Sequence, residues 1–169
     1  MLDLPLAWPE LYNIVLAMKT LAVSTSRQEI LDRLRKLSPE TARRWGRMTC
    51  NQMICHLTDS LKGVIGERSL SPKNNPFSRT VVKWVALRAP IRWPHGVKTR
   101  PEMDQMIGGT RPVEFEKDRL ELEALLDRVT RPNRDFQWSA HPIFGRMSEW
   151  EWQRWAYLHA DHHLRQFGV

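Results

Sequence analysis

Three capping boxes constrain the fold of this chain more than any other feature of its sequence. A capping box is a Ser or Thr followed three residues later by Glu or Gln, and it satisfies unpaired amide groups at a helix start. The pattern occurs at Ser26–Glu29, Thr49–Gln52 and Ser148–Glu151. Apolar residues at helical spacing follow each box. The sequence therefore predicts helices that begin at these three positions.

Further helices follow from apolar periodicity. A long helix is predicted from about Val113 to Val129, and a partly helical stretch over 77–89 ends before Pro90. A short amphipathic helix is also predicted after Pro9, from about Leu11 to Leu21. No stretch reads as a strand, and 169 residues with 41% hydrophobic content suit one domain. Four long helices plus shorter ones predict an all-α helical bundle.

The last predicted helix carries histidines on its buried side. His159 and His163 are four residues apart, so their imidazoles lie on one face, one turn apart. On a helical wheel at about 100° per residue, both fall within the apolar stripe. Burying two imidazoles costs free energy unless each nitrogen finds a partner. A divalent metal ion is such a partner, because it binds neutral imidazole.

His56 is the third candidate ligand, in the helix that follows the Thr49–Gln52 capping box. It falls at the edge of the apolar stripe of that helix, close to Met53. Asp59 lies one turn further on and could orient the His56 imidazole, although a solvated acid is the alternative. Three converging imidazoles would form an open metal site. Zn²⁺ or Ni²⁺ suits three nitrogen ligands best, and Fe²⁺ and Mn²⁺ are alternatives.

Other side chains are candidates for the surroundings of such a site. Gln166 shares the face of His163 and could hydrogen-bond a ligand histidine, a water or a substrate, or satisfy backbone at the helix end. Trp152 is expected in the core more than as a substrate platform. His141 lies in a loop beside a proline and is expected at the surface or at a pocket entrance. His162 borders the apolar stripe and is expected to face solvent or a neighbouring side chain.

The basic charge of the chain is uneven. The net charge is +7, and the segment Lys62–Arg100 holds nine Lys or Arg residues against one acid, Glu67. Nucleic acid or an anionic membrane surface must therefore be considered. On the helix predicted over 77–89, however, Arg79 and Lys83 share a face while Arg88 points nearly opposite. We interpret the charge mainly as solvated surface and rank nucleic-acid binding last.

Cysteine content and hydropathy indicate a cytoplasmic protein. Cys50 and Cys55 suit a reducing compartment, and their spacing is not that of a structural zinc site. No stretch reaches the ~18 apolar residues of a membrane span. Asp3 and Glu10 argue against a secretory signal.

Several of these motifs resemble those of the DinB-like (YfiT-like) superfamily of metal-binding four-helix bundles. The resemblance is carried by His56-Leu57-x-Asp59 and by His159-x-x-x-His163-x-x-Gln166. The chain more closely resembles one branch of this superfamily, a family of uncharacterised bacterial proteins. That resemblance is carried by His141-Pro142-x-Phe144-Gly145, Trp150 and residues 162–168. The resemblance covers residues 18–169 as a single domain. Residues 1–17 form an N-terminal extension that could be part of a first helix.

The resemblance implies an up-down-down-up bundle in which His56, His159 and His163 hold a metal ion. The superfamily includes thiol-dependent transferases and an isomerase, and its members often form homodimers. We therefore expect a divalent-metal-dependent enzyme, a hydrolase or a thiol S-transferase, that activates water or a small thiol towards an unknown small-molecule substrate. The first alternative is a non-catalytic, ligand-binding or dimerising bundle. The second is a nucleic-acid binder that uses the basic segment.

Overall fold

The computed structural model describes residues 18–169, so most of the helix predicted from Leu11 lies outside the described residues. Within residues 18–169 the fold is all-α, as predicted, with five α-helices and no strand. The α-helices are α2 (Ser24–Leu34), α3 (Cys50–Val64), α4 (Lys83–Arg88), α5 (Phe115–Arg128) and α6 (Glu149–Gln166). A π-helical turn, η1 (Ser78–Val82), leads into α4, and a 3₁₀ turn, η2 (Pro101–Met103), interrupts the long connection that follows.

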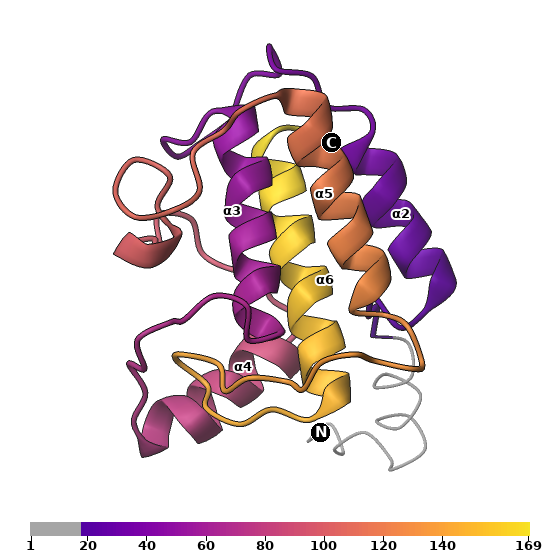
Figure 1. The fold of residues 1–169 in the computed structure, drawn as a ribbon. Coiled ribbons are helices and arrows are strands. Elements are labelled where there is room, and N and C mark those ends of the chain that lie inside the picture. The colour runs from indigo at the N-terminus through magenta and orange to yellow at the C-terminus, as the bar shows by residue number, and fades with distance from the viewer. Residues whose placement is uncertain (1–17) are drawn as a thin grey trace, which may run out of the picture.

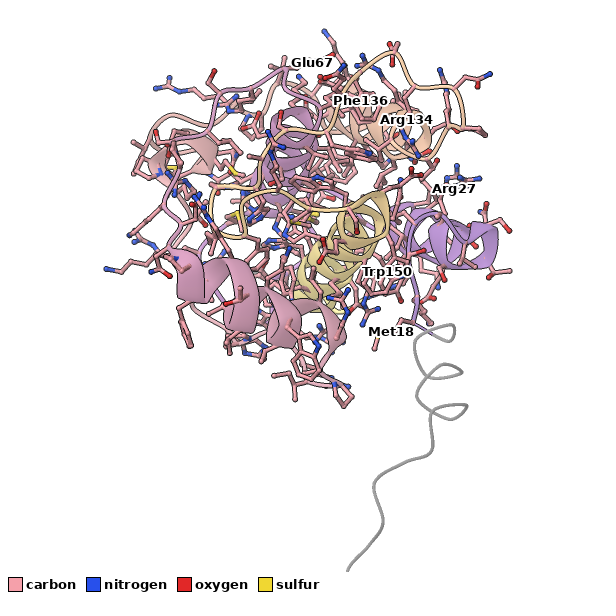
Figure 2. All side chains as sticks on the ribbon, turned by 90° about the horizontal axis from the view of Figure 1, so that it is seen from below. Met18, Arg27, Glu67, Arg134, Phe136 and Trp150 are labelled. Atoms are coloured by element: carbon pink, nitrogen blue, oxygen red, sulfur yellow. The ribbon has the colours of Figure 1, made fainter. Side chains whose placement is uncertain are left out.

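The four longer helices lie side by side, with α3 against α5 and α6, and α2 against α6 (Figure 1). The short helix α4 packs across one end of this group, where it contacts α6. Viewed from below, the start of α6 around Trp150 lies between α2 and α4 (Figure 2). This arrangement places α3 and α6, which carry the candidate ligands, next to each other at the centre.

Helix α3 is the most buried element, and it buries polar side chains as well as apolar ones. Twelve of its 15 residues are buried. The buried polar side chains of α3 are His56, Thr58, Asp59 and Ser60. Because a buried polar group costs free energy unless it is hydrogen-bonded, partners are expected, and all of these side chains except Thr58 have one. Their partners turn out to organise the candidate site.

Two of the three predicted capping boxes are confirmed. The hydroxyl of Thr49 accepts from the Gln52 amide at 3.3 Å, and the hydroxyl of Ser148 accepts from the Glu151 amide at 3.2 Å. Both reciprocal bonds are also present. These caps fix where α3 and α6 begin, and hence which of their residues face each other.

The third predicted capping box, at Ser26–Glu29, is wrong. Helix α2 begins at Ser24, and no side chain caps its first turn. Ser26 is already inside the helix and buried. With the N-cap at Val23, Glu29 is not placed to close a box, and its carboxylate pairs with Lys19 at 2.6 Å.

The stretch predicted as helix over 77–89 forms as η1 followed by α4. Its apolar residues surround the axis, so Phe77, Val81 and Trp84 are exposed. Part of its positive charge is paired, since Lys83 and Arg88 both reach Glu151 of α6, at 3.3 and 3.6 Å. None of the helices in residues 18–169 combines the length and the apolar character that crossing a membrane requires.

Candidate metal centre

The structure brings His56, His159 and His163 together, as the sequence predicted. One ring nitrogen from each histidine lies within 4.8 Å of the other two. The Nε2 atoms of His56 and His159 are 3.2 Å apart. Two nitrogens that bind one tetrahedral metal ion at ~2.05 Å each lie about 3.3 Å apart. The three side chains could therefore hold a metal ion.

The His56 ring is oriented by a backbone carbonyl. Its Nδ1 lies 3.0 Å from the carbonyl oxygen of Met103, which can only accept. Nδ1 must therefore carry the proton, and Nε2 presents its lone pair to the other two histidines. Without a metal, the proton between the two Nε2 atoms must come from His159. A metal ion would take the place of that proton.

The His163 ring is oriented by a side chain on its own helix. Its Nδ1 lies 2.8 Å from Oε1 of Gln166, whose amide nitrogen donates to the backbone carbonyl of Trp45 at 2.8 Å. This second bond fixes which end of the Gln166 amide is the acceptor. His163 Nδ1 therefore donates, and its Nε2 is also left with a lone pair directed away from Gln166.

Burial keeps all three imidazoles neutral. It lowers the pKa of His56 below 6.5, and it lowers the pKa values of His159 and His163 well below 6.5. The neighbouring histidines lower the pKa values of His159 and His163 further, since a second positive charge would be repelled. Neutral imidazole is the form that binds metal ions, so the electrostatics favour metal over protons.

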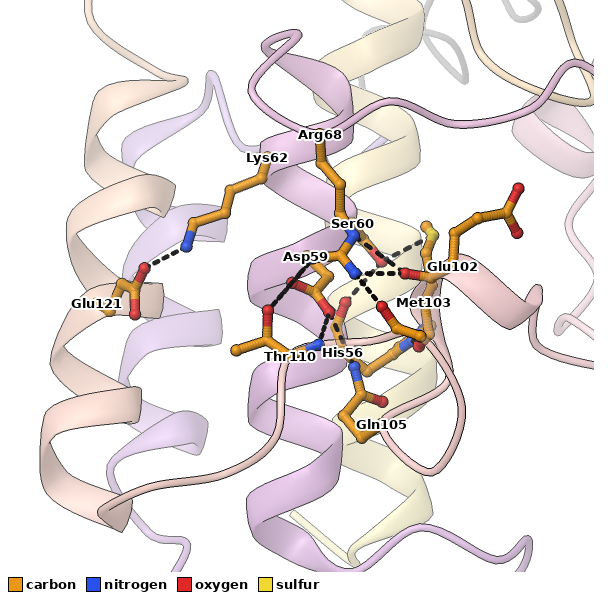
Figure 3. Close-up of polar contacts among 11 residues, drawn as sticks. His56, Asp59, Ser60, Lys62, Arg68, Glu102, Met103, Gln105, Thr110 and Glu121 are labelled. Atoms are coloured by element: carbon orange, nitrogen blue, oxygen red, sulfur yellow. Dashed lines mark hydrogen bonds and ion pairs between the residues drawn. The ribbon is translucent and has the colours of Figure 1, made fainter.

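A buried ion pair holds the loop that supports His56 (Figure 3). Asp59 is fully buried and accepts four hydrogen bonds, from Arg68 at 2.9 Å, from Gln105 at 3.1 Å, and from the amide and hydroxyl of Thr110 at 2.8 and 2.6 Å. Arg68 also donates to the carbonyl of Glu102, next to Met103. Asp59 thus acts on His56 through the loop, and it makes no direct bond to the imidazole.

Aromatic rings line the site on its more open side. His159 is partly exposed, whereas His56 and His163 are buried. Trp155 and Trp93 lie against the His159 ring, with centroids 4.8 and 6.1 Å away. A narrow apolar cavity between the helices also reaches His159. It is lined mainly by Ile30, Leu34, Leu57, Leu61, Leu122 and Leu126.

The remaining predicted site residues take different places. Gln166 contacts a ligand histidine directly. Met53 is fully buried in the core of α3, one turn before His56. Trp152 is also a core residue, whose ring contacts Trp138, Trp155 and His141. His162 lies beside His163, with centroids 5.2 Å apart, outside the group of three.

The expectation that His141 lies at the surface is wrong. The side chain is only 6% exposed, because its ring stacks on Phe144 and packs against Trp152 and Trp155 of α6. The loop position and the adjacent proline suggested exposure. The turn instead folds the ring back onto the helix that carries two of the candidate ligands.

Sequence reasoning missed the groups that complete the site. The carbonyls of Met103 and Trp45 orient two of the histidines, and a backbone carbonyl leaves no signal in a sequence. Arg68 and Thr110 were missed because their partner, Asp59, lies on another element. Trp93 could have been singled out as a large ring between two prolines in an irregular segment.

Residues 18–168 match the family described as "Protein of unknown function (DUF1569)". The chain belongs to this family. No curated protein and no solved structure matched the chain. The family therefore names no reaction, and a function has to be argued from the site.

Proposed function

We propose that this protein is a divalent-metal-dependent enzyme that uses His56, His159 and His163 to hold the ion. The main support is the arrangement of ring nitrogens. Two of the three rings donate Nδ1–H to fixed acceptors, Met103 O and Gln166 Oε1, so their other nitrogens are free to coordinate. Such support of the ligand ring by a second hydrogen bond is usual in metal sites.

The chemistry of the proposed enzyme follows from the ligand set. Three neutral imidazoles leave the ion its full charge and at least one open position. A bound ion of this kind lowers the pKa of coordinated water to about 7, or binds a thiol as thiolate. Zn²⁺ or Ni²⁺ suits the three nitrogens, with Fe²⁺ and Mn²⁺ as alternatives. The reaction would be hydrolysis or thiol transfer on a small molecule.

A thiol in this reaction would have to come from outside the chain. Cys50 and Cys55 are free and buried, and burial raises the pKa of each thiol to about 12. Neither therefore supplies a thiolate near neutral pH. A low-molecular-weight thiol from a reducing compartment fits this requirement. We propose that this compartment is the cytoplasm.

We also propose that residues 18–169 form a DinB-like four-helix bundle with up-down-down-up topology. The support is the side-by-side packing of α2, α3, α5 and α6, with the candidate ligands on two adjacent helices (Figure 1). The homodimer that the resemblance implies stays a prediction.

Elemental analysis of the purified, tag-free protein tests the proposal. We expect about one metal ion per chain, lost in the His56→Ala, His159→Ala and His163→Ala variants. His162→Ala is the matched control, because His162 neighbours His163 but stands outside the group of three. Undiminished metal in the His159→Ala variant, or loss in the control alone, would contradict the assignment.

A non-catalytic ligand-binding protein is the second candidate function. The apolar cavity that reaches His159 marks where such a ligand would enter, but its volume of about 10 Å³ holds no more than one water, so the helices would have to move apart. This alternative predicts no metal in the native protein, no uptake on reconstitution, and unchanged thermal stability after chelation.

Nucleic-acid binding ranks last. Lys62, Arg68, Lys83, Arg88 and Arg100, all in the basic segment, are paired with carboxylates of this chain.

A further inference from the structure

The turn that carries His141 is built as a rigid unit. His141 and Gly145 exchange two backbone hydrogen bonds of 2.8 Å, and Gly145 adopts a φ of +68°, which favours glycine. Two side chains from residues 74–78, at the start of η1, hold the outside of the turn. Asn74 donates to the carbonyl of Pro142 at 3.2 Å, and Ser78 donates to that of Ile143 at 2.9 Å. The turn therefore fixes where its histidine lies.

The same turn fixes the proton on the His141 ring. The amides of Ile143 and Phe144 both donate to Nδ1, at 3.1 and 3.0 Å. Nδ1 is therefore an acceptor, and the neutral ring carries its proton on Nε2. Burial lowers the pKa of His141 to about 3, so the ring stays neutral. None of the hydrogen bonds within residues 18–169 uses this Nε2–H, and the atom is not among the buried groups that lack a partner, so it reaches solvent.

This unpartnered donor lies one ring away from the candidate metal ligands. Trp155 contacts both His141 and His159, with centroid distances of 5.3 and 4.8 Å. His141 is also close enough to His159 to lower the pKa of His159. A molecule bound at the three histidines and lying along Trp155 would extend towards His141.

Arg100 adds a positive charge near the same place. Its charge lowers the pKa of His141 further. The Arg100 Nη2 atom donates to the carbonyl of Ser71 at 2.6 Å and pairs with Glu102 at 3.2 Å. Its Nε is buried and has no hydrogen-bond partner in residues 18–169. Two N–H donors without acceptors, one of them on a cation, are suited to an anionic oxygen.

The geometry points to His141 as a specificity residue that donates Nε2–H to a carboxylate or similar anionic group of the substrate, with the unpartnered Nε–H of Arg100 as a second donor. This inference rests on the proposed function, because the metal ion would hold the other end of the molecule. It narrows the substrate class to small molecules that carry an anionic oxygen in addition to the atom that binds the metal.

A pair of thiols that differ in one group tests the inference. The full chain is loaded with Co²⁺, and thiolate binding is followed by visible absorption during titration with 3-mercaptopropionate or 1-propanethiol. In the variant His141→Asn, Oδ1 can take the place of Nδ1 and still accept from the turn amides, while the Nε2–H donor is lost. We expect the native protein to prefer 3-mercaptopropionate, and His141→Asn to lose about tenfold of this affinity with propanethiol unchanged.

His95→Asn is the control, because it removes an exposed imidazole that stacks on Trp45 away from His141. It should keep the preference. Arg100→Gln should also reduce the preference for 3-mercaptopropionate. If His141→Asn does not fold, Arg100→Gln serves as the test of the inference. A native protein that takes up Co²⁺ without preferring 3-mercaptopropionate overturns the role of His141 alone. A native protein that takes up no Co²⁺ overturns the proposed function itself.

Discussion

His56 and His163 are supported in different ways, although they face the same point. His163 is held by Gln166, three residues further along the same helix. His56 is held by the carbonyl of Met103, which is 47 residues away, at the end of the 3₁₀ turn η2 in the long connection between α4 and α5. The first support forms whenever α6 forms. The second requires the loop to be held in place, and Asp59 with Arg68 does this (Figure 3).

The difference between these supports teaches where the site is vulnerable. A support within one helix costs little conformational entropy, because helix formation already places the two side chains together. A support on a loop depends on every contact that orders the loop. Damage to the His56 support should therefore reduce stability and metal affinity together, whereas damage to the His163 support should reduce metal affinity more than stability.

The largest effect is expected from Asp59→Asn. The substitution leaves the Arg68 charge without its buried partner and weakens the bonds from Thr110 and Gln105. We expect the free energy of unfolding to fall by about 3 kcal/mol, as for other broken buried pairs. Urea denaturation of the metal-free protein measures this change.

The control for Asp59→Asn is Glu121→Gln, which breaks the Lys62–Glu121 pair on the outer side of the same helix (Figure 3). Because Glu121 is substantially exposed, the loss should stay below about 1 kcal/mol. Equal losses in the two variants would show that the Asp59 pair does not order the loop.

Gln166→Ala is expected to lower metal affinity more than stability. It removes the acceptor for His163 Nδ1–H, so metal affinity should fall by roughly 10- to 100-fold. Competition with a chromophoric chelator measures the affinity. Gln166→Glu keeps an acceptor for His163 but places a second oxygen against the Trp45 carbonyl, so it should recover only part of the affinity. If Gln166→Ala binds metal as tightly as the native protein, Gln166 has no part in the site.

Acid should destabilise the metal-free protein. The pKa values of His56, His159 and His163 are lowered in the folded state, so the unfolded chain binds protons that the folded chain does not. Stability is therefore full above pH ~6.5 and falls as the pH drops below that value. His141, with a pKa of about 3, contributes about 1 kcal/mol of this loss by pH 5.5. Thermal unfolding between pH 7.5 and 5.5 measures it, and a constant Tm would contradict the neutral cluster.

The smallest effect is expected from Gly46→Ala. Gly46 has a φ of +81°, and a Cβ there would press on the amide nitrogen of Gln166. The backbone strain should cost about 1 kcal/mol. Displacement of Gln166 should weaken metal binding less than its removal does. If Gly46→Ala binds metal more weakly than Gln166→Ala does, the segment around Trp45 must support the site through contacts other than Gln166.

The features that the sequence could predict are those with short-range causes. The capping boxes at Thr49 and Ser148 placed α3 and α6, and the spacing of His159, His163 and Gln166 placed three site residues on one face. His56 was predicted because a helical stripe also located it. The Ser26 box failed because α2 begins two residues earlier, at Ser24, which places Ser26 inside the helix.

The parts that could not be predicted depend on long-range contacts. The residue that orients His56 is a carbonyl at Met103, and its position is decided by an ion pair between Asp59 and Arg68 across the end of α3. His141 was misplaced for a similar reason. The Pro142 and Gly145 that indicated a turn say nothing about which surface the turn packs against.

The candidate ligands come from two helices whose nearest histidines are 103 residues apart in the chain. An unfolded chain would offer a metal only the His159–His163 pair, so the complete site exists in the folded state alone. Binding would then add to stability by mass action, about 4 kcal/mol at a thousandfold excess over Kd. In a cell, the lifetime of such a protein against proteolysis would rise and fall with the supply of its metal.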